Sequence, residues 1–124
     1  MEQFGYRKLL AYQKAKEVLI HTYGLLRSFP VEERYAMCDQ LRRASVSVTS
    51  NIAEGVNRYS AKEKIHFLEI AFGSLMEVSS QLEVACDLGY ITKEDLKNMD
   101  LLVSNTARLI VGLQKSYKSD CRTT

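Results

Sequence analysis

Residues 40–55 read Gln-Leu-Arg-Arg-Ala-Ser-Val-Ser-Val-Thr-Ser-Asn-Ile-Ala-Glu-Gly, and the fold depends on how this stretch is buried. Serine, threonine and valine are weak helix formers, yet residues of like polarity recur here at alternating three- and four-residue steps, as they do on a helix. The apolar stripe comprises Leu41, Ala44, Val48, Ile52 and Gly55. The polar stripe beside it comprises Gln40, Arg43, Ser47, Asn51 and Glu54. We expect a helix that buries both stripes and therefore lies in the middle of a bundle.

The same periodicity continues on both sides of this stretch. Pro30 is the one proline of the chain, so long uninterrupted helices are allowed almost everywhere else. We predict four helices, over residues of about 7–28, 31–54, 61–88 and 93–118. No alternation typical of strands competes with them. Short connections favour antiparallel neighbours, so the sequence predicts an all-α fold, an antiparallel up-down-up-down four-helix bundle in which residues 1–124 form one domain.

Several residues are expected to mark where these helices begin and end. Ser60-Ala-Lys-Glu has the form of a capping box, and Thr92-Lys-Glu-Asp resembles one. Gly55 and Gly89 follow apolar stripes, at positions where glycine often ends a helix in the left-handed conformation. Gly73 lies inside the third predicted helix, where glycine costs about 1 kcal/mol relative to alanine, so we expect another backbone to approach closely there.

The polar stripe is predicted to form a network with the third helix. Antiparallel pairing about the turn near residues 57 and 58 would place Ser47 opposite Glu69, Asn51 opposite His66, and Gln40 near Glu77. Buried charges are tolerated when they are paired, so we predict that Arg43 bonds Glu69 or Glu77. The predicted structural polar network comprises Gln40, Arg43, Ser47, Asn51, Glu54, Glu69 and Glu77. We interpret it as setting helix register, not as an active site.

An enzymatic alternative is a carboxylate-bridged metal centre of the kind that four-helix bundles house. Glu63-Lys-Ile-His66 fits the Glu-x-x-His motif, but a di-iron site needs two copies, and the other histidine, His21, follows Glu17 by four residues. The three cysteines show no C-x-x-C spacing, and no serine or cysteine has a histidine placed to activate it. The favoured expectation is no enzyme, no catalytic residue, no cofactor and no metal.

Basic residues supply a second functional hypothesis. The net charge is only +2, and surface solvation accounts for most of these side chains. They could also contact the phosphates of nucleic acid, through a basic strip along the fourth helix and through basic residues scattered around the first. The candidate nucleic-acid contacts are Arg7, Lys8, Lys14, Arg108, Lys115, Lys118 and Arg122. Since neither a secretory leader nor a membrane-spanning run is apparent, we expect a cytoplasmic protein without a membrane partner.

Together these residues resemble a known family. The resemblance is carried by the string at 40–55, by Arg58, by Phe67-Leu-Glu-Ile-Ala-Phe-Gly-Ser-Leu-Met-Glu, by Leu9-Leu-Ala-Tyr-Gln-Lys-Ala, by Phe29-Pro30 with Glu33, and by Asp87-Leu-Gly-Tyr. The chain closely resembles the bacterial four-helix-bundle proteins named after intervening sequences of 23S ribosomal RNA genes. The resemblance covers nearly the whole chain.

The resemblance implies a four-helix bundle that assembles as a ring of five identical subunits. The family name records where the genes were first noticed and shows no activity on ribosomal RNA. Related accessory proteins of diversity-generating retroelements associate with a reverse transcriptase and nucleic acid. The expectation is a non-enzymatic homopentameric interaction protein, with RNA or a nucleic-acid-associated protein as its candidate partner.

Overall fold

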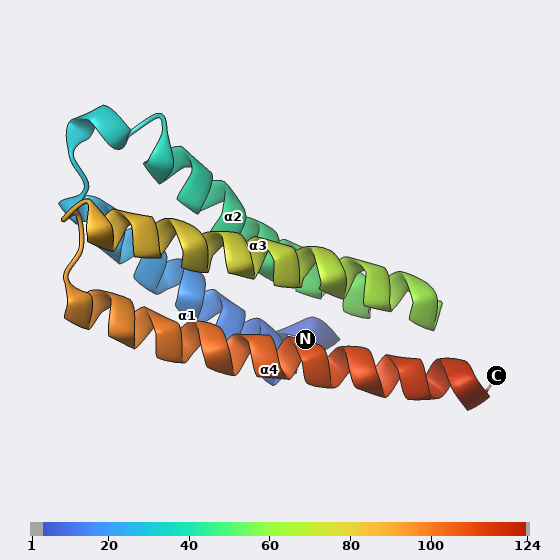
Figure 1. Cartoon of the computed structure of the whole chain (residues 1–124). Helices are drawn as coiled ribbons and strands as arrows, with labels where there is room; N and C mark the ends of the chain where they lie inside the picture. The colour runs from blue at the N-terminus through green and yellow to red at the C-terminus, as the bar shows by residue number, and fades with distance from the viewer. Residues whose placement is uncertain (1–3, 124) are drawn as a thin grey trace.

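The computed structural model describes the backbone of residues 4–123 and the side chains of residues 4–120. It contains four α-helices, α1 (Leu10–Leu25), α2 (Met37–Val56), α3 (Ala61–Asp87) and α4 (Lys93–Thr123), and no strand occurs within residues 4–123. Short 3-10 helices cover Gly5–Lys8, Leu26–Ser28 and Val31–Glu33. The chain reverses its direction at each connection between the four long helices (Figure 1). The predicted all-α helical bundle is therefore confirmed.

Each helix packs against two neighbours around one core. The contacts join α1 to α2 and α4, and α3 to the same two helices. The predicted apolar stripe of residues 41–55 is buried, and its side chains belong to one core cluster with buried side chains of α3 and α4. The largest fully buried hydrophobic side chains are Leu41, Val48, Ile52, Leu68, Leu75, Leu82 and Ile110.

The polar stripe of α2 is not buried, which corrects the expectation that this helix hides both stripes. Gln40, Arg43 and Glu54 are exposed, and Ser47 and Asn51 are half-buried. The reason is that α2 packs against two of the long helices, α1 and α3, so its remaining side faces outward.

Several helix bounds differ from the prediction. The first α-helix begins at Leu10 because Gly5–Lys8 forms a separate 3-10 turn, and the fourth continues to Thr123. The second begins at Met37 instead of residue 31, since Val31–Glu33 is a 3-10 turn. In place of a longer helix, the carboxylate of Glu33 accepts a hydrogen bond from the Met37 amide at 3.5 Å.

The predicted helix starts are confirmed at both capping sites. Ser60 Oγ accepts a hydrogen bond from the Glu63 amide at 3.1 Å. Thr92 and Asp95 cap each other, with the Asp95 amide 3.0 Å from Thr92 Oγ1 and the Thr92 amide 3.0 Å from Asp95 Oδ2. These bonds satisfy amides that a helix leaves unpaired at its first turn.

The two glycines expected to end helices behave differently. Gly89 has φ of 82° and ends α3 in the left-handed region, as predicted. Gly55 lies inside α2 instead, where a Cβ atom would come within 2.8 Å of Phe67 Cβ and 3.3 Å of the Lys64 carbonyl oxygen. A Cβ on Gly73 would meet no atom of the described residues within 4 Å. The close backbone approach thus occurs at Gly55. The expected approach of another backbone of the same chain at Gly73 is wrong.

A polar contact joins the α1–α2 connection to the end of α3. The Tyr90 hydroxyl donates to Glu33 Oε2 at 2.9 Å, and the Ser28 hydroxyl lies 2.7 Å from the Tyr90 carbonyl oxygen. The Phe29 and Tyr90 rings pack with their centroids 5.2 Å apart. The hydrogen bond to Glu33, together with burial, raises the pKa of Tyr90 above its usual value, so the phenol stays protonated and donates.

We expect Glu33→Ala to lower the melting temperature by a few degrees, because both carboxylate oxygens accept hydrogen bonds. Glu32→Ala, at an exposed neighbour, should melt like the parent. The pKa of Tyr90 is raised in the folded state, so its stabilising contribution is complete below the unfolded pKa near 10 and is lost as the pH rises through the folded pKa. Thermal unfolding followed by circular dichroism checks both points, and equal melting of the two variants would contradict the role of Glu33.

Candidate functional site

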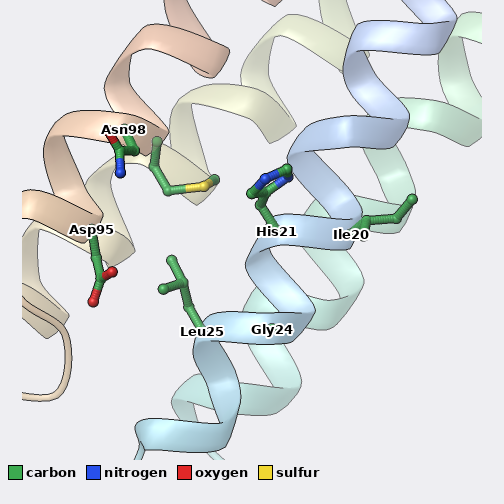
Figure 2. A pocket seen from close by; sticks show the side chains of 7 residues that line it. Ile20, His21, Gly24, Leu25, Asp95 and Asn98 are labelled. Carbon is green, nitrogen blue, oxygen red and sulfur yellow. The ribbon is translucent and has the colours of Figure 1, made fainter.

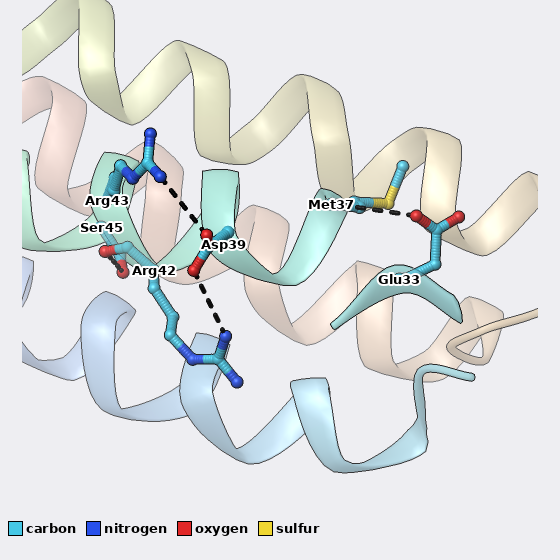
Figure 3. Close-up of polar contacts among 6 residues, drawn as sticks. All are labelled: Glu33, Met37, Asp39, Arg42, Arg43 and Ser45. Atoms are coloured by element: carbon cyan, nitrogen blue, oxygen red, sulfur yellow. Dashed lines mark hydrogen bonds and ion pairs between the residues drawn. The ribbon is translucent and has the colours of Figure 1, made fainter. Parts of the chain in front are cut away.

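The predicted pairing of Arg43 with Glu69 or Glu77 is wrong. Arg43 Nη2 lies 3.3 Å from Asp39 Oδ2 on the same helix, its side chain is 79% exposed, and Arg42 approaches the same carboxylate (Figure 3). Glu69 and Glu77 are exposed and form no ion pair with the described side chains.

The cause is the register between α2 and α3. Ser47 Oγ lies 2.8 Å from Ser74 Oγ, more than one helical turn along α3 from Glu69. This shift, and the rotation that accompanies it, turns the two glutamates outward. Part of the expected network survives in a smaller form, because the Asn51 side-chain amide donates to the Ser47 carbonyl oxygen at 2.8 Å and reaches Ser47 Oγ at 3.0 Å.

A second polar cluster locks the α2–α3 turn. Arg58 Nη2 forms an ion pair with Glu54 Oε1 at 2.7 Å, and the Arg58 guanidinium carbon lies 4.6 Å from the centroid of the Phe67 ring. The Cβ of the same phenylalanine touches the site where Gly55 lacks one. Residues that carried the family resemblance thus serve packing at this turn, and neither sequence spacing nor charge pattern had indicated it.

The outer face of α3 has no partner among the described residues. We define this face by four exposed residues, Ile70, Gly73, Glu77 and Val84. Their spacing of three, four and seven residues places them on the same side of the helix. Ile70 is 40% and Val84 is 43% exposed, and the space around Gly73 is open. The face therefore combines apolar side chains, a position without a side chain, and a carboxylate without an ion pair among the described side chains.

The charges are divided between two halves of the bundle. Residues 4–20, 47–74 and 104–120, which we call the basic half, contain the α2–α3 turn and hold ten Lys or Arg against five Asp or Glu. Residues 21–46 and 75–103, the acidic half, contain the other two connections and hold six against nine. Because neighbouring helices run in opposite directions, segments far apart in sequence contribute to each half (Figure 1). The small net charge conceals this separation.

The structure brings several candidate nucleic-acid contacts into the basic half. Arg108 lines a groove with Leu9 and Leu10, so the 3-10 turn Gly5–Lys8, which holds Arg7 and Lys8 just before α1, is next to the later turns of α4. Lys115 is exposed seven residues after Arg108 and shares its face.

The other candidates are placed differently. Lys118 lines a groove with Ile65 and Glu69 and so turns toward α3. Lys14 forms an ion pair with Glu17 at 3.0 Å, and the side chain of Arg122 lies outside the described side chains.

The residues considered for metal binding are separated. His66 packs edge-on against Phe67, whereas His21 Nδ1 lies 2.9 Å from the Glu17 carbonyl oxygen on α1. Among the described residues, no group of three or more His, Cys, Asp or Glu side chains could hold a metal ion. Burial raises the pKa of the Cys38 thiol and so disfavours the nucleophilic thiolate.

An apolar groove lies between α1 and α4. Figure 2 shows Asp95 and Asn98 on α4 across from Leu25 and His21 on α1. The Asp95 carboxylate already accepts the Thr92 amide as a helix cap. The groove therefore offers apolar contact without a convergent set of reactive groups.

None of the helices in the described part of the chain is long and apolar enough to span a membrane.

Comparison with protein families matches residues 7–112 to the model for 23S rRNA-intervening sequence proteins. A crystal structure from Bacteroides thetaiotaomicron, of a protein of unknown function from the S23 ribosomal protein family, is similar with a TM-score of 0.77. It is 24% identical over 86% of this chain and 99% of that chain, a likeness that shows the shared fold. No curated protein matches the chain.

Proposed function

Because the chain belongs to the 23S rRNA-intervening sequence protein family, we propose that it is a non-enzymatic, cytoplasmic, self-assembling interaction protein that forms a ring of five subunits. The observation that carries the proposal is the outer face of α3. A contiguous exposed apolar patch can mark a surface that contacts another protein, and we propose that Ile70 and Val84 contribute to such a patch. Open space at Gly73 would let the backbone of a second copy approach, and the outward polar residues of α2 and α3 could pair with groups on that copy.

The mass of the purified chain in solution tests self-assembly. Light scattering should give about five times the monomer mass of 14.1 kDa, and the peak should persist on dilution through the micromolar range. A mass near 14.1 kDa would contradict the proposal.

We further propose nucleic acid as the partner, supported by the division of charge. A positive surface attracts phosphates and releases counterions, so binding should weaken steeply as salt rises. This surface is supplied by the 3-10 turn before α1 and by α4, with the residues Arg7, Lys8, Arg108 and Lys115.

Mobility shift with a structured RNA should show binding at low salt that falls as salt is added. Lys115→Glu should weaken binding several-fold, since it reverses one charge in the basic half. Lys97→Glu makes the same change at an exposed lysine of the acidic half and should have little effect. The proposal fails if the parent does not bind at low salt or if the two variants bind equally.

A further inference from the structure

A pocket beside the α2–α3 turn has a composition that the fold does not explain. It lies between the start of α3 and the last turns of α4 and has a volume of about 400 Å³. Clefts of roughly 300–1,000 Å³ are large enough for small ligands or for one unit of a polymer. The lining residues are Tyr59, Ser60, Ala61, Lys62, Lys64, Tyr117 and Asp120.

The two tyrosines of this pocket differ in what covers them. The ring of Tyr117 is half-buried, and Lys64 Nζ lies 4.9 Å from its centroid. Tyr59 is fully exposed and makes no hydrogen bond or ring contact with any described residue. An aromatic ring that is fully exposed to water does not stabilise the fold by burial. It does leave a flat face on which another ring can stack.

The charges around the pocket favour an anion. Lys62 is exposed and forms no ion pair with the described side chains, and Lys64 contributes a second ammonium group. Asp120 is the one carboxylate in the lining. The pocket also lies in the basic half, whose charge raises the local concentration of anions.

We propose that this pocket holds one unpaired nucleotide of a nucleic-acid strand, with its base stacked on Tyr59 and its phosphate beside Lys62 and Lys64. Both base faces are covered by neighbours in a duplex, so stacking on a protein ring requires an unpaired base. An acidic peptide would use the lysines without the exposed ring, and inorganic phosphate would do the same. This assignment rests on the proposed nucleic-acid binding and names the part of the strand that is recognised.

The test measures fluorescence anisotropy of a labelled adenosine RNA strand, and of the same strand paired with its complement, on the full chain. Tyr59→Ala should weaken binding of the single strand about 10-fold, the usual size of one base–aromatic stack, and should leave duplex binding unchanged. Tyr59→Phe keeps the ring and should bind like the parent. Tyr35→Ala removes a tyrosine that is 82% exposed in the α1–α2 connection and should also bind like the parent.

Equal binding by Tyr59→Ala and Tyr35→Ala would overturn the proposal that this pocket binds a nucleotide. A Tyr59→Phe variant that binds as weakly as Tyr59→Ala would overturn it too. Adenosine monophosphate that displaces the strand at the same nucleotide concentration would assign the pocket to a free nucleotide and overturn the strand assignment. If Lys115→Glu weakens duplex binding while Tyr59→Ala has no effect on the single strand, the proposed function stands and this inference fails. If the parent binds neither RNA at low salt, both fail.

Discussion

Gly55→Ala is expected to destabilise the fold by about 1–3 kcal/mol, although the same change inside a helix ordinarily stabilises it. The added Cβ would lie 2.8 Å from Phe67 Cβ and 3.3 Å from the Lys64 carbonyl oxygen. Neither atom is the end of a flexible side chain, so relief requires α2 and α3 to move apart. That movement would also disturb the Arg58 guanidinium, which rests on the Phe67 ring.

Gly112→Ala is the matched control for this variant. Gly112 is also inside a helix, but a Cβ there would meet nothing within 4 Å. Its replacement should therefore stabilise the chain by up to about 1 kcal/mol through helix propensity and lower entropy of the unfolded state. Urea unfolding at one fixed protein concentration measures both changes. Changes of the same sign would show that the α2–α3 contact is looser than the structure indicates.

Local sequence signals predicted the elements of this fold because local interactions determine them. The spacing of Leu41, Val48 and Ile52 predicted an apolar helix face, and all three residues are buried. The capping residues at Ser60 and Thr92 bond amides within their own turn, so their role can be recognised without knowing any neighbour.

The register between helices could not be predicted in the same way. Equal rise on both sides of the turn placed Ser47 opposite Glu69, but packing at Gly55 sets a different offset, and Ser47 meets Ser74. A shift of this size turns some side chains from the inside of a contact to the outside. The predicted ion pairs of Arg43 failed for this reason, while the Ser47–Asn51 hydrogen bonds, which lie within one helix, do not depend on the register.

The candidate surfaces also depend on long-range arrangement. Arg7 and Lys115 are far apart in the sequence, yet the packing of α1 against α4 brings the turn before α1 and the later turns of α4 into one basic half. Tyr59 carried no sequence signal, because a lone tyrosine in a turn is ordinary. Tyr59 becomes a candidate binding residue only because the last turns of α4 lie beside it and supply Tyr117 to the same pocket.

Ile70→Arg should convert the proposed five-subunit assembly into single chains. Ile70 is 40% exposed in the isolated chain, so an arginine there can extend into water without disturbing the core. In an assembly that covers the outer face of α3, the same arginine would be buried without an ion-pair partner. An unpaired buried charge typically costs several kcal/mol. The cost falls on association and leaves the folding of the single chain nearly unchanged.

Leu101→Arg is the control, because Leu101 is 61% exposed on α4 and lies outside the outer face of α3. Light scattering should give Ile70→Arg a mass near the monomer value of 14.1 kDa and Leu101→Arg the mass of the parent, with circular dichroism showing equal helix content. If Ile70→Arg assembles like the parent, the outer face of α3 is not the contact between copies.

Because Gly73 lies on the same face with open space around it, Gly73→Leu should weaken assembly in the same direction without adding any charge. Agreement between a charged and an uncharged change would tie the assembly to contact across this face and separate it from a general effect of charge.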